Sequence, residues 1–217
     1  MAYIRPKNID LVKRLTGFHK SYFIIADLEK ILDLKKDSLY VTLNRLVKSG
    51  TLIRLRKNIY TLFTKPLDHE KIANQLYFPS YLSFEQALSR YSILSQIPYT
   101  LTFATPRPTK KTEIGETVVE YSHLPQELYF GYLLKDEIYI AEPEKALLDQ
   151  LYMVSRGKRA IVTEELDLKD INRSKLETYA EKFPKYIKPL LDQVRQYIGT
   201  TPITLEGNER VHSEGSP

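Results

Sequence analysis

The segment from Lys35 to Leu62 constrains the fold most, because its hydrophobic pattern changes at a single glycine from a helical period to a strand period. The first half has apolar side chains at i, i+4, i+7 and i+8, which form one stripe on an amphipathic helix. These side chains are Leu39, Leu43, Leu46 and Val47. We expect the helix to end at Ser49-Gly50, since glycine readily adopts the left-handed conformation of a helix C-cap.

The opposite face of this predicted helix carries side chains that can hydrogen-bond base edges or phosphates. They are Ser38, Tyr40, Thr42, Asn44, Arg45 and Lys48. Lys35 and Lys36 lie at its start, and Asp37 is the expected N-cap.

After Gly50 the sequence predicts a β-hairpin with a basic tip. Leu52, Arg54 and Arg56 alternate with Ile53 and Leu55, which is the period of a strand. Lys57-Asn58 then interrupts the pattern before Ile59-Tyr60-Thr61-Leu62. Asparagine tolerates the positive φ that tight hairpin turns require.

Two shorter helices and a strand are predicted before this segment. A first helix runs to about Leu15 with Asn8 or Asp10 as its cap, and a second begins at Asp27. Tyr22-Phe23-Ile24-Ile25 is a short β-prone run that could pair with the hairpin. Helices, glycine and basic hairpin in this order predict a winged helix-turn-helix in residues 1–65.

Charge is distributed unevenly along the chain. Through Lys65 there are 14 Lys/Arg against 5 Asp/Glu, a net charge of +9; from Pro66 onward the counts are 18 and 22, a net charge of −4. A basic patch confined to one domain indicates nucleic-acid binding, although a solvated basic surface would show the same counts.

Residues 66–199 predict a second domain with a small, mostly antiparallel sheet, so that the whole chain is α+β. Helices are expected at 69–76, 84–91 with Ser83 as cap, 143–154, 175–183 and 186–198, and strands at 99–104, 117–121, 129–134 and 138–141. We expect residues 200–217 to be a disordered tail.

Residue content argues against most enzyme classes. Cysteine is absent, the four histidines are scattered, and neither a phosphate-binding glycine loop nor a nucleophile elbow is present. We therefore expect no enzyme activity, no metal and no cofactor. No secretory signal or run of eighteen apolar residues occurs, which predicts a cytoplasmic location without membrane contact.

Two charged clusters of the second domain have alternative interpretations. Glu142, Lys145 and Asp149 could bind a metal or nucleotide along one helix face, or could form ordinary helix-dipole and i, i+4 interactions. Arg107, Lys110 and Lys111 lie in a predicted loop and could contact DNA phosphates or an acidic partner, or could simply be solvated.

Four stretches in order carry a family resemblance: LIRLRKNIYTL, YLSFEQALSRYSIL, TLTFATPRPTK and IYIAEPEKALLDQLY. Over roughly residues 1 to 190 the chain resembles the AbiE-type (AbiEi) antitoxins of type IV toxin–antitoxin, or abortive-infection, systems of phage defence. Wings in that family commonly carry glycine where this chain has Asn58.

The resemblance implies a transcriptional repressor that binds inverted repeats in its own promoter, and an antitoxin that counteracts a nucleotidyltransferase toxin without a stable complex. We then expect base contacts from Ser38, Tyr40, Thr42, Asn44 and Arg45. Lys35, Lys36 and Lys48 would hold phosphates, and the wing would contribute Arg54, Arg56, Lys57 and Asn58. The second domain would mediate dimerisation or cooperative assembly on DNA, or supply antitoxicity through Arg107, Lys110, Lys111, Glu142, Lys145 and Asp149. The alternative is a winged-helix regulator whose second domain is an interaction or enzymatic module unrelated to a toxin.

Overall fold

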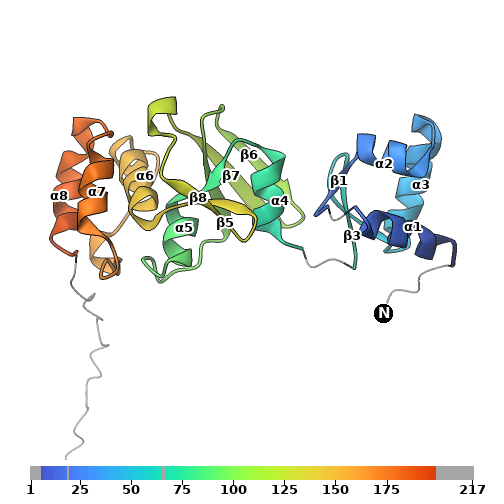
Figure 1. Ribbon diagram of the computed structural model, residues 1–217, viewed down its shortest axis with the longest axis horizontal. Helices are drawn as coiled ribbons and strands as arrows, with labels where there is room; N and C mark the ends of the chain where they lie inside the picture. The colour runs from blue at the N-terminus through green and yellow to red at the C-terminus, as the bar shows by residue number, and fades with distance from the viewer. Residues whose placement is uncertain (1–5, 19, 65–66, 199–217) are drawn as a thin grey trace, which may run out of the picture.

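The computed structural model describes residues 6–18, 20–64 and 67–198, which form a mixed α+β protein. The boundary expected at Lys65-Pro66 and the tail expected at 200–217 lie outside the described residues. Figure 1 shows α1, α2 and α3 at one end of the long axis and α7 and α8 at the other.

The first part of the chain consists of three helices and a three-stranded antiparallel sheet in the order β1-β3-β2. Its elements are α1 (Pro6–Thr16), β1 (Phe23–Ile24), α2 (Ile25–Leu32), α3 (Lys36–Lys48), β2 (Leu52–Arg56) and β3 (Ile59–Leu62). Leu39, Leu43 and Leu46 of α3 are buried in a core that also contains Leu15 and Phe23. The predicted apolar stripe of α3 and the pairing of residues 23–24 with the hairpin are confirmed.

The helix starts differ from those expected. α1 begins at Pro6, so Asn8 and Asp10 lie inside the helix and are not its cap. Proline suits the first position of a helix, because its nitrogen has no hydrogen that would lack an acceptor there. Lys35 is the N-cap of α3, and Asp37 lies in the first turn, where its charge faces the helix dipole. α2 begins at Ile25, two residues before Asp27, and the Asp27 carboxylate reaches back to accept the backbone N–H of Ile24 at 3.2 Å.

The hairpin turns as predicted, but its first strand is irregular. Gly50 has φ of +71° and Asn58 has φ of +65°. The pairing register shifts between Arg54 and Arg56. As a result Leu55 is buried, and the simple alternation predicted for residues 52–56 is wrong, because a bulge changes the face to which the following side chains point.

The second part contains a six-stranded mixed sheet in the order β6-β7-β5-β4-β9-β8. Its strands are β4 (Tyr81–Leu82), β5 (Thr100–Thr105), β6 (Lys110–Ile114), β7 (Thr117–His123), β8 (Tyr132–Lys135) and β9 (Ile138–Ala141). β4 is parallel to β9 and β5 is parallel to β7. The predicted small, mostly antiparallel sheet is therefore wrong in size, and the sheet is mixed. The parallel pairs join strands that are not consecutive in sequence, which hydrophobic alternation does not reveal.

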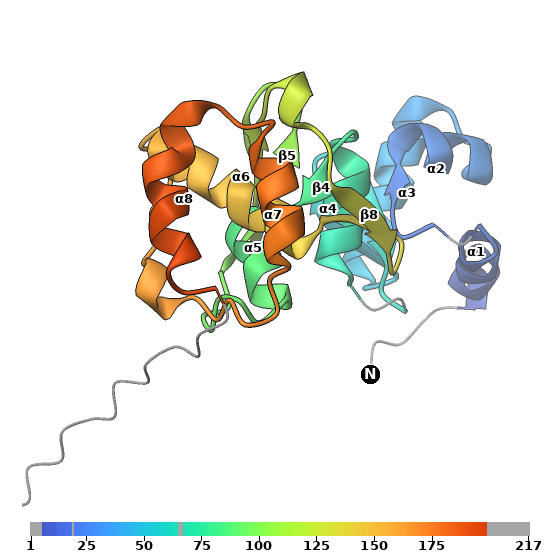
Figure 2. The same ribbon diagram turned by 60° about the vertical axis from the view of Figure 1, so that its left-hand side comes forward.

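This part also contains helices and short 3-10 turns. They are α4 (His69–Leu76), α5 (Phe84–Arg90), α6 (Pro143–Ser155), α7 (Arg173–Ala180), α8 (Lys188–Arg195), η1 (Gln126–Leu128), η2 (Thr163–Glu165) and η3 (Lys185–Ile187). The predictions for α4, α5 and α6 hold closely, including Pro143 at the start of α6. α7 and α8 pack beside α6 at the end of the molecule away from α1–α3 (Figure 1, Figure 2).

One predicted loop is a strand. Lys110 and Lys111 open β6, which pairs with β7 through Lys110↔Tyr121 and Lys111↔Glu120. Proline at 106 and 108 ends β5 but does not prevent a strand from starting two residues later.

The hairpin is held against the second part of the chain. Leu55 and Ile59 belong to the larger hydrophobic core, which also contains Ile72. The Leu55 carbonyl accepts a hydrogen bond from the Gly115 N–H at 3.0 Å, and the Arg56 guanidinium donates to Thr112 Oγ1 at 3.2 Å. The hairpin thus contributes to both cores.

We predict that stability depends on whether the residue at position 58 can adopt a positive φ at low cost. Asn58→Gly should change the free energy of unfolding by less than about 1 kcal/mol, whereas Asn58→Val should lower it by about 1–2 kcal/mol. Urea unfolding measures both, with Lys57→Val as the matched control outside the left-handed region. Equal stabilities of the Gly and Val variants would contradict the turn geometry.

Candidate nucleic-acid interface

The solvent face of α3 presents the predicted polar set. Lys35, Lys36, Ser38, Asn44, Arg45 and Lys48 are exposed, while Tyr40 and Thr42 are half-buried. Val41, which sequence analysis did not assign, is 71% exposed between them. The sequence could have assigned Val41 to the exposed face, because it lies outside the apolar stripe of α3. An exposed methyl group on such a face can contact a thymine methyl group.

The cations of α3 form no ion pairs with other residues of the described part of the chain. Within the described residues, no carboxylate lies within 4.0 Å of Lys35, Lys36, Arg45 or Lys48. In contrast, Arg90, Arg159 and Arg195 of the second part each pair with two acids. Positive charge near α3 is therefore available to an external anion.

The predicted hairpin residues do not form one surface. Arg54 and Lys57 are exposed, and Asn58 is half-buried at the turn. Arg56 lies beyond the register shift and turns toward β6, where it donates to Thr112. The tip cations available to a ligand are therefore Arg54 and Lys57, while Arg56 belongs to the junction.

Arg56, Arg107 and Lys110 form a second basic cluster at this junction, which we call the junction cluster. The Arg107 guanidinium carbon lies 4.1 Å and the Lys110 Nζ 4.8 Å from the centre of the Tyr77 ring. Burial, and then repulsion from Arg56 and Arg107, lower the pKa of Lys110. A bound anion would relieve this repulsion. Lys111 faces the other side of β6, because adjacent strand residues alternate.

The junction cluster also lacks carboxylate partners. None of the ion pairs formed by residues 6–18, 20–64 and 67–198 includes Arg56, Arg107 or Lys110. The Arg107 guanidinium donates to the Phe78 carbonyl at 2.9 Å, which fixes its position. The sequence identified Arg107 and Lys110 as candidate contact residues. It did not predict that they lie near Arg56, since the residues are over 50 positions apart.

Glu142, Lys145 and Asp149 do not form one accessible face. Lys145 and Asp149 make an ion pair with both side chains fully buried, so the predicted contact surface is wrong for these two residues. Glu142 is separate and accepts from Lys175 at 2.5 Å and from Tyr179. Sequence spacing identified the i, i+4 pair but not its burial, which depends on the packing of α6 between the sheet and α7.

The Asp149 carboxylate is a structural acceptor. Besides Lys145, it accepts from the Tyr81 hydroxyl at 2.9 Å and from Ser83 Oγ at 2.8 Å. Ser83 is the N-cap residue of α5, yet its hydroxyl bonds Asp149 rather than the helix backbone. Burial raises the pKa of Asp149 and lowers that of Lys145. This network fastens β4 and the start of α5 to α6.

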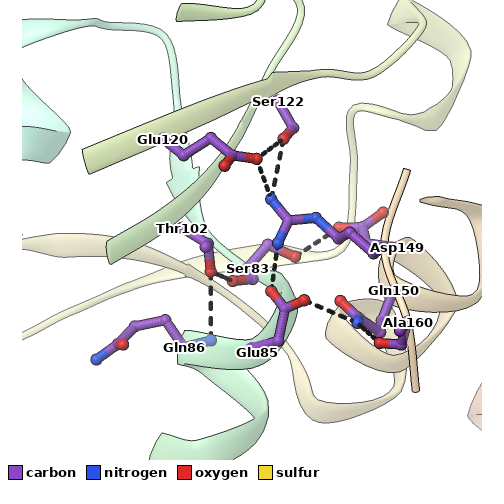
Figure 3. Close-up of polar contacts among 10 residues, drawn as sticks. Ser83, Glu85, Gln86, Thr102, Glu120, Ser122, Asp149, Gln150 and Ala160 are labelled. Carbon is purple, nitrogen blue, oxygen red and sulfur yellow. Dashed lines mark hydrogen bonds and ion pairs between the residues drawn. The ribbon is translucent and has the colours of Figure 1, made fainter. Parts of the chain in front are cut away.

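A third polar cluster surrounds Arg159, which sequence analysis missed. Its guanidinium donates to Glu85, to Glu120 at 2.6 Å and to Ser122 at 3.1 Å, and it lies over the Phe84 ring. Figure 3 shows the Glu85, Glu120 and Ser122 side chains pointing toward one another. Because the Arg159 guanidinium is mostly buried and pairs with two carboxylates, the cluster fixes the position of residue 159 against α5 and β7.

Metal-binding groups and membrane-spanning helices are both absent from the described part of the chain. Among its residues, no group of three or more His, Asp or Glu side chains is arranged to hold a metal ion. No helix among them combines the length and apolar character needed to cross a bilayer.

No protein-family model matches the chain, and no curated protein matches its sequence.

We predict that the buried ion pair contributes strongly to stability only as a pair. Lys145→Met leaves Asp149 charged and buried, and should lower the free energy of unfolding by about 3–5 kcal/mol. Adding Asp149→Asn removes that charge while retaining acceptors for Tyr81 and Ser83, so the double variant should recover part of the loss. Lys175→Met, at partly exposed ion pairs with Glu142 and Glu144, should lower the free energy of unfolding by less than Lys145→Met does. Chemical denaturation tests the series, and a double variant less stable than Lys145→Met would contradict it.

Proposed function

We propose that residues 6–64 form a winged helix-turn-helix that binds double-stranded DNA, and that the chain represses transcription. The observation that carries this proposal is the exposed face of α3, which has hydrogen-bond donors, and cations without an acidic partner among the described residues, next to a basic hairpin. An α-helix fits the major groove, where each base pair presents a distinct pattern of donors and acceptors.

The side chains divide by reach and chemistry. Asn44 and Arg45 can make bidentate contacts with adenine and guanine, and Ser38, Tyr40 and Thr42 can add single contacts. Lys35, Lys36 and Lys48 flank this set and would hold phosphates. Arg54 and Lys57 place two further cations on the hairpin, whereas Arg56 turns toward β6 and lies outside the proposed duplex surface.

We further propose that the protein is an AbiE-type antitoxin that controls its own operon. This step rests on the resemblance of the four sequence stretches, and on the attachment of a mildly acidic second part to a basic DNA-binding part. The chain would act on inverted repeats and counteract a nucleotidyltransferase toxin without a stable complex. Assembly on adjacent half-sites would follow from the two-fold symmetry of such repeats.

Binding to the protein's own promoter should distinguish base-reading from phosphate contacts. Arg45→Ala should cost about 1–3 kcal/mol and relax specificity at one base pair. Lys57→Ala should weaken all sequences similarly and reduce the slope of log K against log salt by about 1. Fluorescence anisotropy on duplex promoter fragments at several salt concentrations measures both effects. Lys169→Ala, at an exposed lysine far from α3 in sequence, is the control.

Unchanged affinity and salt dependence in Arg45→Ala and Lys57→Ala would contradict the assignment of this face to DNA.

Repression and protection from the toxin should separate in the same variants. Asn44→Ala with Arg45→Ala should release repression of a promoter reporter, yet still protect cells from the product of the neighbouring toxin gene, because we propose that the second part of the chain supplies protection. Growth measured during controlled toxin expression tests this. Loss of both properties in a folded variant would assign protection to DNA binding instead.

A further inference from the structure

An aromatic hollow lies at the edge of the larger sheet where β4 begins. Its volume is about 90 Å³, and it is lined by Phe78, Pro79, Tyr129, Tyr132 and Tyr139. Four of the five lining side chains are aromatic rings, and Phe78 is 59% exposed. An exposed ring beside a ring-lined hollow offers a stacking surface for a planar group.

Contacts with buried residues fix the positions of two of the rings that line the hollow. Tyr132 stacks on the buried Tyr81 ring with centroids 4.7 Å apart and planes at 15°, and Tyr81 is anchored by its hydrogen bond to Asp149. Tyr139 meets Tyr132 edge-on at 5.9 Å, and its backbone N–H donates to Asn74 Oδ1 at 3.1 Å. A ligand would therefore enter a prearranged site and would not have to order these rings.

Phe78 connects the hollow to the positively charged side chain of Arg107. The carbonyl of Phe78 accepts from the Arg107 guanidinium at 2.9 Å, and the ring of the preceding residue, Tyr77, contacts both Arg107 and Lys110. This edge also carries His123 at the end of β7, whose Nδ1 lies 3.1 Å from the Arg107 carbonyl oxygen. Rings and unpaired cations thus follow one another along a single edge of the sheet.

We propose that this edge binds single-stranded nucleic acid, with a base stacked on the exposed Phe78 ring at the mouth of the aromatic hollow and a backbone phosphate on Arg107 and Lys110. Base stacking on aromatic side chains, combined with cations that follow the backbone, is the chemistry by which single strands are bound without sequence reading. Duplex DNA would use the cations but keeps its bases paired and stacked, so it would leave the rings unused. An acidic peptide would likewise engage the cations and leave the hollow without a planar group.

This site is separate from the proposed duplex contacts on α3 and does not depend on them. Its residues come from the α4–β4 and β5–β6 connections, from the segment after η1 and from β8 and β9. In Figure 1, α3 lies farther from the larger sheet than β1 and β3 do. Variants of either surface can therefore test one activity while the other serves as a measure of intact folding.

The test is fluorescence anisotropy of the full chain with a fluorescein-labelled thymidylate strand of about 12 nucleotides, a length within the usual range of such sites. A strand of equal length with abasic sugars keeps the phosphates but removes the bases. We expect the abasic strand to bind about 5- to 150-fold more weakly, which corresponds to one stacked base. Phe78→Ala should cause a loss of similar size, and Phe78→Tyr should restore binding.

Matched controls separate stacking from charge and from folding. Tyr99→Ala, at a fully exposed ring elsewhere, should leave the affinity unchanged. Arg107→Ala with Lys110→Ala should weaken binding and reduce the salt slope by about 1–2, and Arg45→Ala should affect promoter duplex only. The proposal would be overturned if the thymidylate and abasic strands bound with equal affinity, or if a polyglutamate peptide displaced the labelled strand as well as unlabelled thymidylate does. Either result would leave a simple anion site. Wild-type affinity in a folded Phe78→Ala variant would also overturn the proposal.

Discussion

The position of Leu55 links the two hydrophobic cores of this protein. A register shift in β2 directs this side chain into the larger core, while Leu52, three residues earlier, remains in the smaller one. The Leu55 carbonyl then accepts from Gly115, and Arg56 follows toward β6. Because the hairpin contributes side chains to both cores, it cannot move as a free arm, and Arg56 next to its turn is held close to Lys110 of β6.

A second constraint is the buried acceptor Asp149. It joins α6 to β4 and to the first turn of α5 through Tyr81, Ser83 and Lys145, all of which are buried. Tyr81 in turn supports the ring of Tyr132 in the aromatic hollow. A charged group in the centre of the domain therefore sets the geometry of a surface site, although it contacts no ligand itself. Its function is positional, as its burial and its complete set of donors indicate.

The two basic surfaces differ in how the protein treats their charge. On α3 the cations are exposed on a regular helix, where a duplex groove can reach them. At the junction cluster they are drawn together by the fold, against their mutual repulsion, and held by an aromatic ring and a carbonyl. Elsewhere in the second part, arginines such as Arg159 are compensated by acids. This contrast directs attention to the uncompensated groups as candidate anion sites.

Local sequence determined the features that depend on neighbouring residues. The stripe of α3, the glycine that ends it, the turn at Asn58 and the start of α6 at Pro143 all follow from periodicity and backbone preference. The exposed polar face of α3 was predicted for the same reason. Only the tertiary structure decided the parallel strand pairs, the burial of Lys145 with Asp149 and the meeting of Arg56 with Lys110. Each of these depends on contacts between segments distant in sequence, or on packing around a helix, and the pattern within a single segment carries no information about either.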